Sequence, residues 1–179
     1  MIQRSIALIM LLTLASGCVS YRHEIVAPES LAGEIGDSPL VTRVDPVRIE
    51  WRTLDNRLIV QIFNDTDTPV RLRGDRSAIV EPTGQSMSMR PQSIPPASFA
   101  KLILPPRLLV ESDDPQVGMF GGTGTRGTGV GMGVGFGSRS SRYVDAWNWK
   151  PDQQIRLELV FEQDEALTTH MFTVVRRRN

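Results

Sequence analysis

Short stretches of alternating apolar and polar residues run through most of this chain, separated by turn-forming residues. Val47, Ile49 and Trp51 alternate with charged residues, which places three apolar side chains on one face of a predicted strand. A turn-forming pair at 55–56 follows, and then comes a run at 58–63 that is apolar at both alternate sets of positions. Because such a strand is apolar on both faces, we expect it in the middle of a core.

Several further stretches predict strands. The segment 97–104 is strongly apolar and is bracketed by proline pairs, which end strands because proline lacks the ladder donor. Ile155, Leu157, Leu159 and Phe161 occupy alternate positions, and after a polar turn the run 167–175 returns, which predicts a hairpin. Shorter strands are expected at 70–72 and 77–81. The predicted core residues are Ile49, Trp51, Val60, Ile62, Leu102, Leu157, Leu159 and Phe161.

The number and spacing of these strands predict an all-β fold, an antiparallel β-sandwich. The stretch 58–72 resembles the strand, turn and strand of bacterial immunoglobulin-like modules. That resemblance implies an immunoglobulin-like sandwich, and a transthyretin-like sandwich is the alternative. We expect the domain to span 47–176, interrupted by a glycine-rich loop at 111–142.

Within this loop, ten of the twenty residues from 118 to 137 are glycine. Glycines spaced by four resemble the glycine zippers of some outer-membrane lipoproteins, whereas the same glycines at alternate positions fit a strand. Each glycine costs a helix about 1 kcal/mol in water, so we expect this loop not to be helical unless a membrane or partner orders it. Its apolar residues make it a candidate contact surface. They are Met119, Phe120, Met132, Val134 and Phe136.

The first seventeen residues have the pattern of a secretory signal. An apolar run at 6–14 follows Arg4, and small residues lead to Cys18, the only cysteine. This arrangement resembles the lipobox of bacterial lipoproteins, which implies cleavage before Cys18 and diacylation of its thiol. The alternative is an ordinary cysteine, but with no second cysteine it cannot form an intramolecular disulfide.

The resemblance to lipoproteins implies a membrane anchor through the lipid on Cys18. Val19 follows the cysteine in place of the aspartate that favours inner-membrane retention, so we expect the outer membrane, with the protein facing the periplasm. The inner membrane and the cell surface remain alternatives. Residues 18–46 are rich in proline, glycine and polar residues, and they predict a tether with a short helix around 28–32.

Charge gives little reason to expect a polyanionic partner. Acidic and basic residues balance at 20 each, so no nucleic-acid partner is predicted. The string 122–127 fits G-x-G-x-x-G, but neither a βαβ unit nor a following helix supports a nucleotide site. We expect no cofactor, and the predicted partner is another envelope protein.

Four local motifs have a structural and a functional interpretation. Asn64, Asp65 and Asp67 either cap a turn or offer oxygen ligands to calcium, and the turn is favoured. The stretch 73–75 is an Arg-Gly-Asp tripeptide, best explained as a glycine turn. Met87 and Met89 suit either packing or Cu(I), and packing is favoured. Trp147 and Trp149, beside Tyr143 and Lys150, either contact a glycan or membrane or have one ring that plugs the sandwich end, and the plug is favoured.

Catalytic machinery is not evident in the sequence. Only His170 lies in the predicted domain, and the G-x-S-x-G signature of a nucleophile elbow is missing. We therefore predict a non-enzymatic binding or scaffolding module without a metal site. The alternatives are a hydrolase of envelope polymers, which His170 beside an acid and a hydroxyl would favour, and a copper-binding module, which clustering of Met87, Met89 and His170 would favour.

Overall fold

The computed structural model describes residues 20–112, 117–123, 128–134 and 140–178, with side chains described over 20–110 and 141–178. These residues form strands and turns, with one short 3-10 helix, η2 (Glu29–Leu31), and no α-helix in the described part. They divide into two compact units, one of residues up to 105 together with those from 148 onward, and one of residues 106–147.

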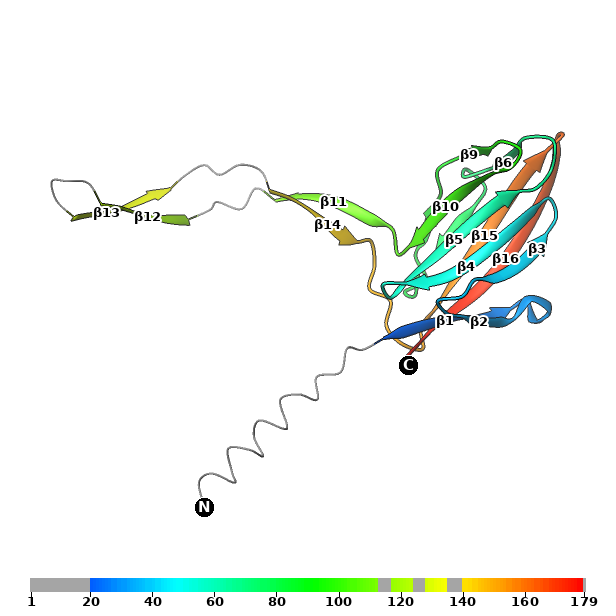
Figure 1. Ribbon diagram of the computed structural model, residues 1–179, viewed down its shortest axis with the longest axis horizontal. Helices are drawn as coiled ribbons and strands as arrows, with labels where there is room; N and C mark the ends of the chain where they lie inside the picture. The colour runs from blue at the N-terminus through cyan, green and yellow to red at the C-terminus, as the bar shows by residue number, and fades with distance from the viewer. Residues whose placement is uncertain (1–19, 113–116, 124–127, 135–139, 179) are drawn as a thin grey trace, which may run out of the picture. The chain divides into compact units, whose positions relative to one another are not determined.

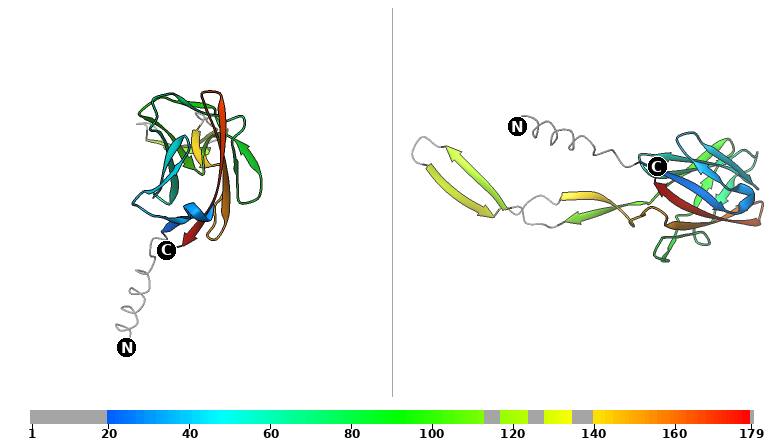
Figure 2. Two further views of the ribbon diagram at one scale, coloured as in Figure 1. Left: turned by 90° about the vertical axis from the view of Figure 1, so that its right-hand side faces the viewer. Right: turned by 90° about the horizontal axis from the view of Figure 1, so that it is seen from below.

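The first unit is an antiparallel β-sandwich, as predicted. Its two sheets appear as facing layers in the end-on view of Figure 2. The four-stranded sheet has the order β10-β5-β4-β3, with β3 (Leu40–Val44), β4 (Val47–Leu54), β5 (Arg57–Asn64) and β10 (Ser98–Leu104). The eight-stranded sheet has the order β2-β1-β16-β15-β6-β9, and β7 pairs with β15 and β8 (Figure 1). Its strands are β1 (Tyr21–Ala27), β2 (Gly33–Ile35), β6 (Val70–Leu72), β7 (Ala78–Val80), β8 (Ser86–Ser88), β9 (Gln92–Ile94), β15 (Gln154–Gln163) and β16 (Ala166–Arg178).

Each sheet contains a tight hairpin with a two-residue loop. Asp55 and Asn56 join β4 to β5 with φ of 49° and 60°, and Asp164 and Glu165 join β15 to β16 with φ of 48° and 67°. Positive φ at both loop residues is the type I′ geometry, whose twist matches that of paired strands. The turn-forming residues predicted from the sequence therefore set the register of both hairpins.

Alternation along the strands fills the space between the sheets. The register places Trp51 beside Val60 in one sheet and Leu157 beside Phe172 in the other, and all four are buried. Trp51 and Phe172 meet across the core with ring centroids 4.9 Å apart. Seven of the eight predicted core residues are buried, whereas Leu102 is only partly covered. Leu102 lies on β10, the last strand of its sheet, so neighbouring strands cover it from one side only.

The tether predicted over 18–46 is wrong for most of its length, because the sandwich already begins at β1. This strand pairs with β16 on one side and β2 on the other, and β3 joins the other sheet. Ile25 and Ile35 are fully buried in the core. The short helix expected near 28–32 is η2. The alternation of β1 was missed because His23, a polar residue, occupies one of its buried positions.

The second unit contains two separate two-stranded sheets. One pairs β11 (Arg107–Ser112) with β14 (Ser140–Asp145), and the other pairs β12 (Val117–Thr123) with β13 (Thr128–Val134). The sequence placed the interruption at 111–142, whereas this unit spans residues 106–147. The strand β11 therefore begins four residues before the predicted boundary. The described residues of the interruption therefore form two separate two-stranded antiparallel sheets.

Candidate functional site

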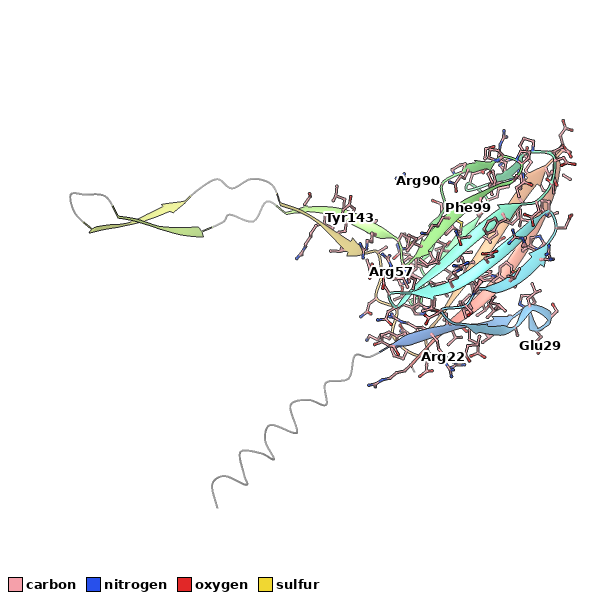
Figure 3. All side chains as sticks on the ribbon, in the orientation of Figure 1. Arg22, Glu29, Arg57, Arg90, Phe99 and Tyr143 are labelled. Atoms are coloured by element: carbon pink, nitrogen blue, oxygen red, sulfur yellow. The ribbon has the colours of Figure 1, made fainter. Side chains whose placement is uncertain are left out.

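The strands β11 and β14 form a ribbon, here called the 107–145 ribbon, that exposes apolar side chains (Figure 3). Leu108 is 47% exposed, Leu109 54%, Val110 37% and Tyr143 67%. The register pairs Leu109 with Tyr143 and Leu108 with Val144, so large apolar residues neighbour one another across the two strands. Apolar pairs of this kind normally stabilise a sheet by facing a core, and here they face outward.

Charged residues lie at both ends of the same ribbon. Arg107 pairs in register with Asp145, and Ala146 continues the ladder by donating its backbone N–H to the carbonyl of Pro106 at 2.8 Å. Toward the other end, Glu111 pairs with Ser141, the neighbour of Arg142. Each strand therefore carries one basic and one acidic residue, in opposite order along the ribbon.

The glycine-rich strands β12 and β13 form a second, separate two-stranded sheet. Their register pairs Met119 with Met132, and Phe120 with Gly131. Val134 pairs with Val117, and Phe136, the last predicted contact residue, lies outside the described residues. The residues 117–123 and 128–134 pair as strands, because glycine keeps the backbone donor and acceptor that a ladder needs. Of the alternatives left open by the sequence, the strand is the one observed.

The lipidation site predicted at Cys18 lies outside the described residues. The first described residue is Ser20, and β1 begins directly after it. Among the described residues there is no helix long and apolar enough to cross a membrane.

Of the residues considered for catalysis and copper binding, His170 and Met87 lie on different strands and Met89 follows the end of β8. His170 on β16 pairs with Leu159, and its Nε2 lies 2.6 Å from the carbonyl oxygen of Asp45. Its ring neighbour is Phe161, at 6.2 Å between centroids. Met87 on β8 pairs instead with Ile79 on β7. Within the part of the chain that the structure describes, no three His, Cys, Asp or Glu side chains gather as metal ligands would.

Asn64 caps a turn, which confirms the structural interpretation of the Asn64 motif. Its buried side-chain amide donates to the carbonyls of Thr68 and Ile94, both at 2.8 Å, and its Oδ1 accepts from the N–H and hydroxyl of Thr66. Asp65 forms an ion pair with Arg48 at 2.7 Å, which lowers the pKa of its carboxyl. The two residues thus stabilise the turn between β5 and β6.

The Arg-Gly-Asp tripeptide is also part of a tight turn. Arg73 donates to both carboxylate oxygens of Asp75, at 3.0 and 2.9 Å, and to Glu162 on β15 at 2.6 Å. A Cβ on Gly74 would lie only 2.4 Å from the backbone of Arg90 and Pro91. The glycine is therefore required by close backbone approach.

A buried polar cluster at one end of the sandwich was not predicted from the sequence. Thr53 donates its hydroxyl to the carbonyl of Ile35 at 2.8 Å, so its oxygen accepts the Nδ1 proton of His23 at 2.9 Å. Its Nε2 is buried with no hydrogen-bond partner among the described residues. Burial, with a smaller contribution from the Arg176 guanidinium, lowers the pKa of His23 to about 3.

Trp149 closes this cluster and supports the expectation of a tryptophan plug. It is buried against His23, with ring centroids 4.8 Å apart, and its Nε1 donates to the carbonyl of Gln153 at 2.9 Å. Arg177 forms ion pairs with Glu24 and Asp152, both at 3.0 Å. These ion pairs and the pairing of β16 with β1 place the terminal arginines in the last strand of the sandwich.

The chain matches no protein-family model, and comparisons with curated proteins and with solved structures give no significant match. Function therefore has to be argued from the residues themselves.

Proposed function

We propose that this chain is a lipid-anchored protein of the bacterial cell envelope that works as a binding or scaffolding module. In this proposal the lipid on Cys18 holds the protein to the outer membrane, and the β-sandwich faces the periplasm. The 107–145 ribbon is the surface that contacts another envelope protein.

The observation that carries the proposal is the exposure of Leu108, Leu109 and Tyr143 on a sheet of only two strands. An isolated two-stranded hairpin is marginally stable in water, and contiguous exposed apolar residues mark interaction sites. A partner that adds a strand to the ribbon would stabilise it, and the same partner would cover its exposed apolar side chains. Binding thus supplies the packing that the ribbon lacks.

The anchor is supported by the sequence alone. The apolar run before Cys18 is too short to span a bilayer comfortably, whereas each acyl methylene that enters a membrane contributes about 0.8 kcal/mol. Two acyl chains suffice for stable attachment, so Cys18 would determine the address of the protein.

The anchor is tested by metabolic labelling with a fatty-acid precursor in cells that express the full chain. Cys18→Ser should abolish labelling and leave unprocessed precursor, because the thiol is the acylated group. Ser20→Ala is the matched control and should be labelled and cleaved normally. Unchanged labelling of Cys18→Ser would overturn the anchor.

The contact surface is tested by placing a photo-crosslinking amino acid at Tyr143 in the full chain. Adducts with an envelope protein are expected in intact cells. The control carries the same amino acid at Met171, which is 69% exposed on the sandwich. Equal yields at the two positions, or no adduct at Tyr143, would contradict the proposed role of the ribbon. Deleting 118–137 removes neither β11 nor β14, so it should leave the melting temperature of the sandwich nearly unchanged.

A further inference from the structure

We infer that the ribbon's partner is a second copy of this chain, joined head to tail through ribbon edges. This inference rests on the proposed function of the 107–145 ribbon and specifies its partner. The strand β11 of one copy would lie antiparallel beside β14 of the next copy.

The two edges of the ribbon are chemically different and complementary. One edge is β11 and the other is β14, because the sheet they form has two strands. Each edge presents a row of backbone donors and acceptors, which is a template for another strand. Two neighbouring copies can satisfy both edges, one by pairing its β14 with β11 and the other by pairing its β11 with β14.

Side-chain chemistry favours the head-to-tail arrangement. If the neighbouring copy adopts the register already present within the ribbon, Arg107 again lies beside Asp145, and Leu109 beside Tyr143. Leu108 likewise lies beside Val144. Every contact between copies would then repeat a pairing that the ribbon already makes, with opposite charges together and apolar residues together.

Two-fold pairing of identical edges is less favourable. With full overlap of two β14 strands, Arg142 would lie opposite Tyr143, and Asp145 opposite Ser140. With two β11 strands, Leu108 would lie opposite Glu111. Both arrangements separate Arg107 from Asp145 and Leu109 from Tyr143, and the β11 arrangement keeps only Leu109 beside Val110 as an apolar pair. Head-to-tail contacts leave free edges at both ends, so they generate either a closed ring or a filament.

Cysteine pairing between differently tagged full-length copies tests this inference. One copy carries Arg107→Cys and the other carries Asp145→Cys, and the two are co-expressed and oxidised in intact cells. We expect a disulfide-linked adduct that contains both tags, since these positions become neighbours. Either variant expressed alone should give none, which also controls for the native Cys18. Combining Arg107→Cys with Met171→Cys on the sandwich is the matched control and should give no adduct.

The other outcomes overturn the inference in distinguishable ways. Adducts formed by Arg107→Cys alone, or by Asp145→Cys alone, would indicate two-fold pairing and exclude the head-to-tail contact. No mixed adduct, together with photo-crosslinks from Tyr143 to a different protein, would overturn self-association and leave the proposed function standing. No mixed adduct and no photo-crosslink would overturn both.

Discussion

Protonation of His23 should make the sandwich sensitive to mild acid. The pKa of its imidazole is about 3 in the folded protein, against 6.5 for an unperturbed histidine. Between these values the unfolded chain binds a proton that the folded chain excludes, so stability falls as the pH drops below 6.5. One pKa unit corresponds to about 1.4 kcal/mol, so lowering the pH to about 5 should cost about 2 kcal/mol of unfolding free energy.

The measurement is urea-induced unfolding of the full chain in detergent, followed by tryptophan fluorescence from about pH 7.5 to about pH 5. His23→Gln should abolish most of the pH dependence, and His170→Gln should retain it. Arginine partners lower the pKa values of Asp65 and Asp75. Their contributions to the unfolding free energy are therefore lost only in more acidic solution than this pH range. Unfolding free energy that stays flat in the native sequence, or a slope that persists in His23→Gln, would refute the role of His23.

Substitutions at three positions test the packing of the sandwich. Leu159→Ala should lower the unfolding free energy by about 2–5 kcal/mol, because Leu159 is fully buried and the change leaves a cavity; urea titration measures it, and a loss near zero would contradict the core assignment. Gly74→Ala should cost about 1–3 kcal/mol, since its Cβ would meet the backbone of the 89–91 segment; an unchanged melting temperature would show that this approach is not tight. Asn64→Ala should cost about 1–3 kcal/mol by stranding two buried carbonyls, and Asn64→Asp should fail to rescue it because a carboxylate cannot donate to them.

The sandwich was predictable wherever strand alternation is complete. Trp51 and Leu159 stand at alternate apolar positions, and turn-forming pairs such as 55–56 mark the hairpin ends, so period and turn chemistry agree. The strand β1 was missed because its buried face includes His23, which becomes acceptable only through the distant hydroxyl of Thr53. Sequence patterns do not contain that tertiary contact.

The ribbon was missed for the opposite reason. Leu108, Leu109 and Val110 are three consecutive apolar residues, a run that equally fits a strand buried on both faces. Only the strand pairing shows that β11 has a single neighbour and that these side chains are exposed. The glycine-rich residues were ambiguous because a period of two contains a period of four. The register of β12 and β13 resolves that ambiguity.

The position of β1 has a mechanical consequence. Two residues separate Cys18 from Tyr21, the first residue of this strand, so tension applied at position 18 reaches β1 first. The strand lies between two neighbours, with six register pairs to β16 and three to β2. Tension along its axis therefore loads these pairs in shear, all at once, whereas an edge strand could be peeled away one pair at a time. The sandwich thus resists pulling at the end where the chain would leave the membrane.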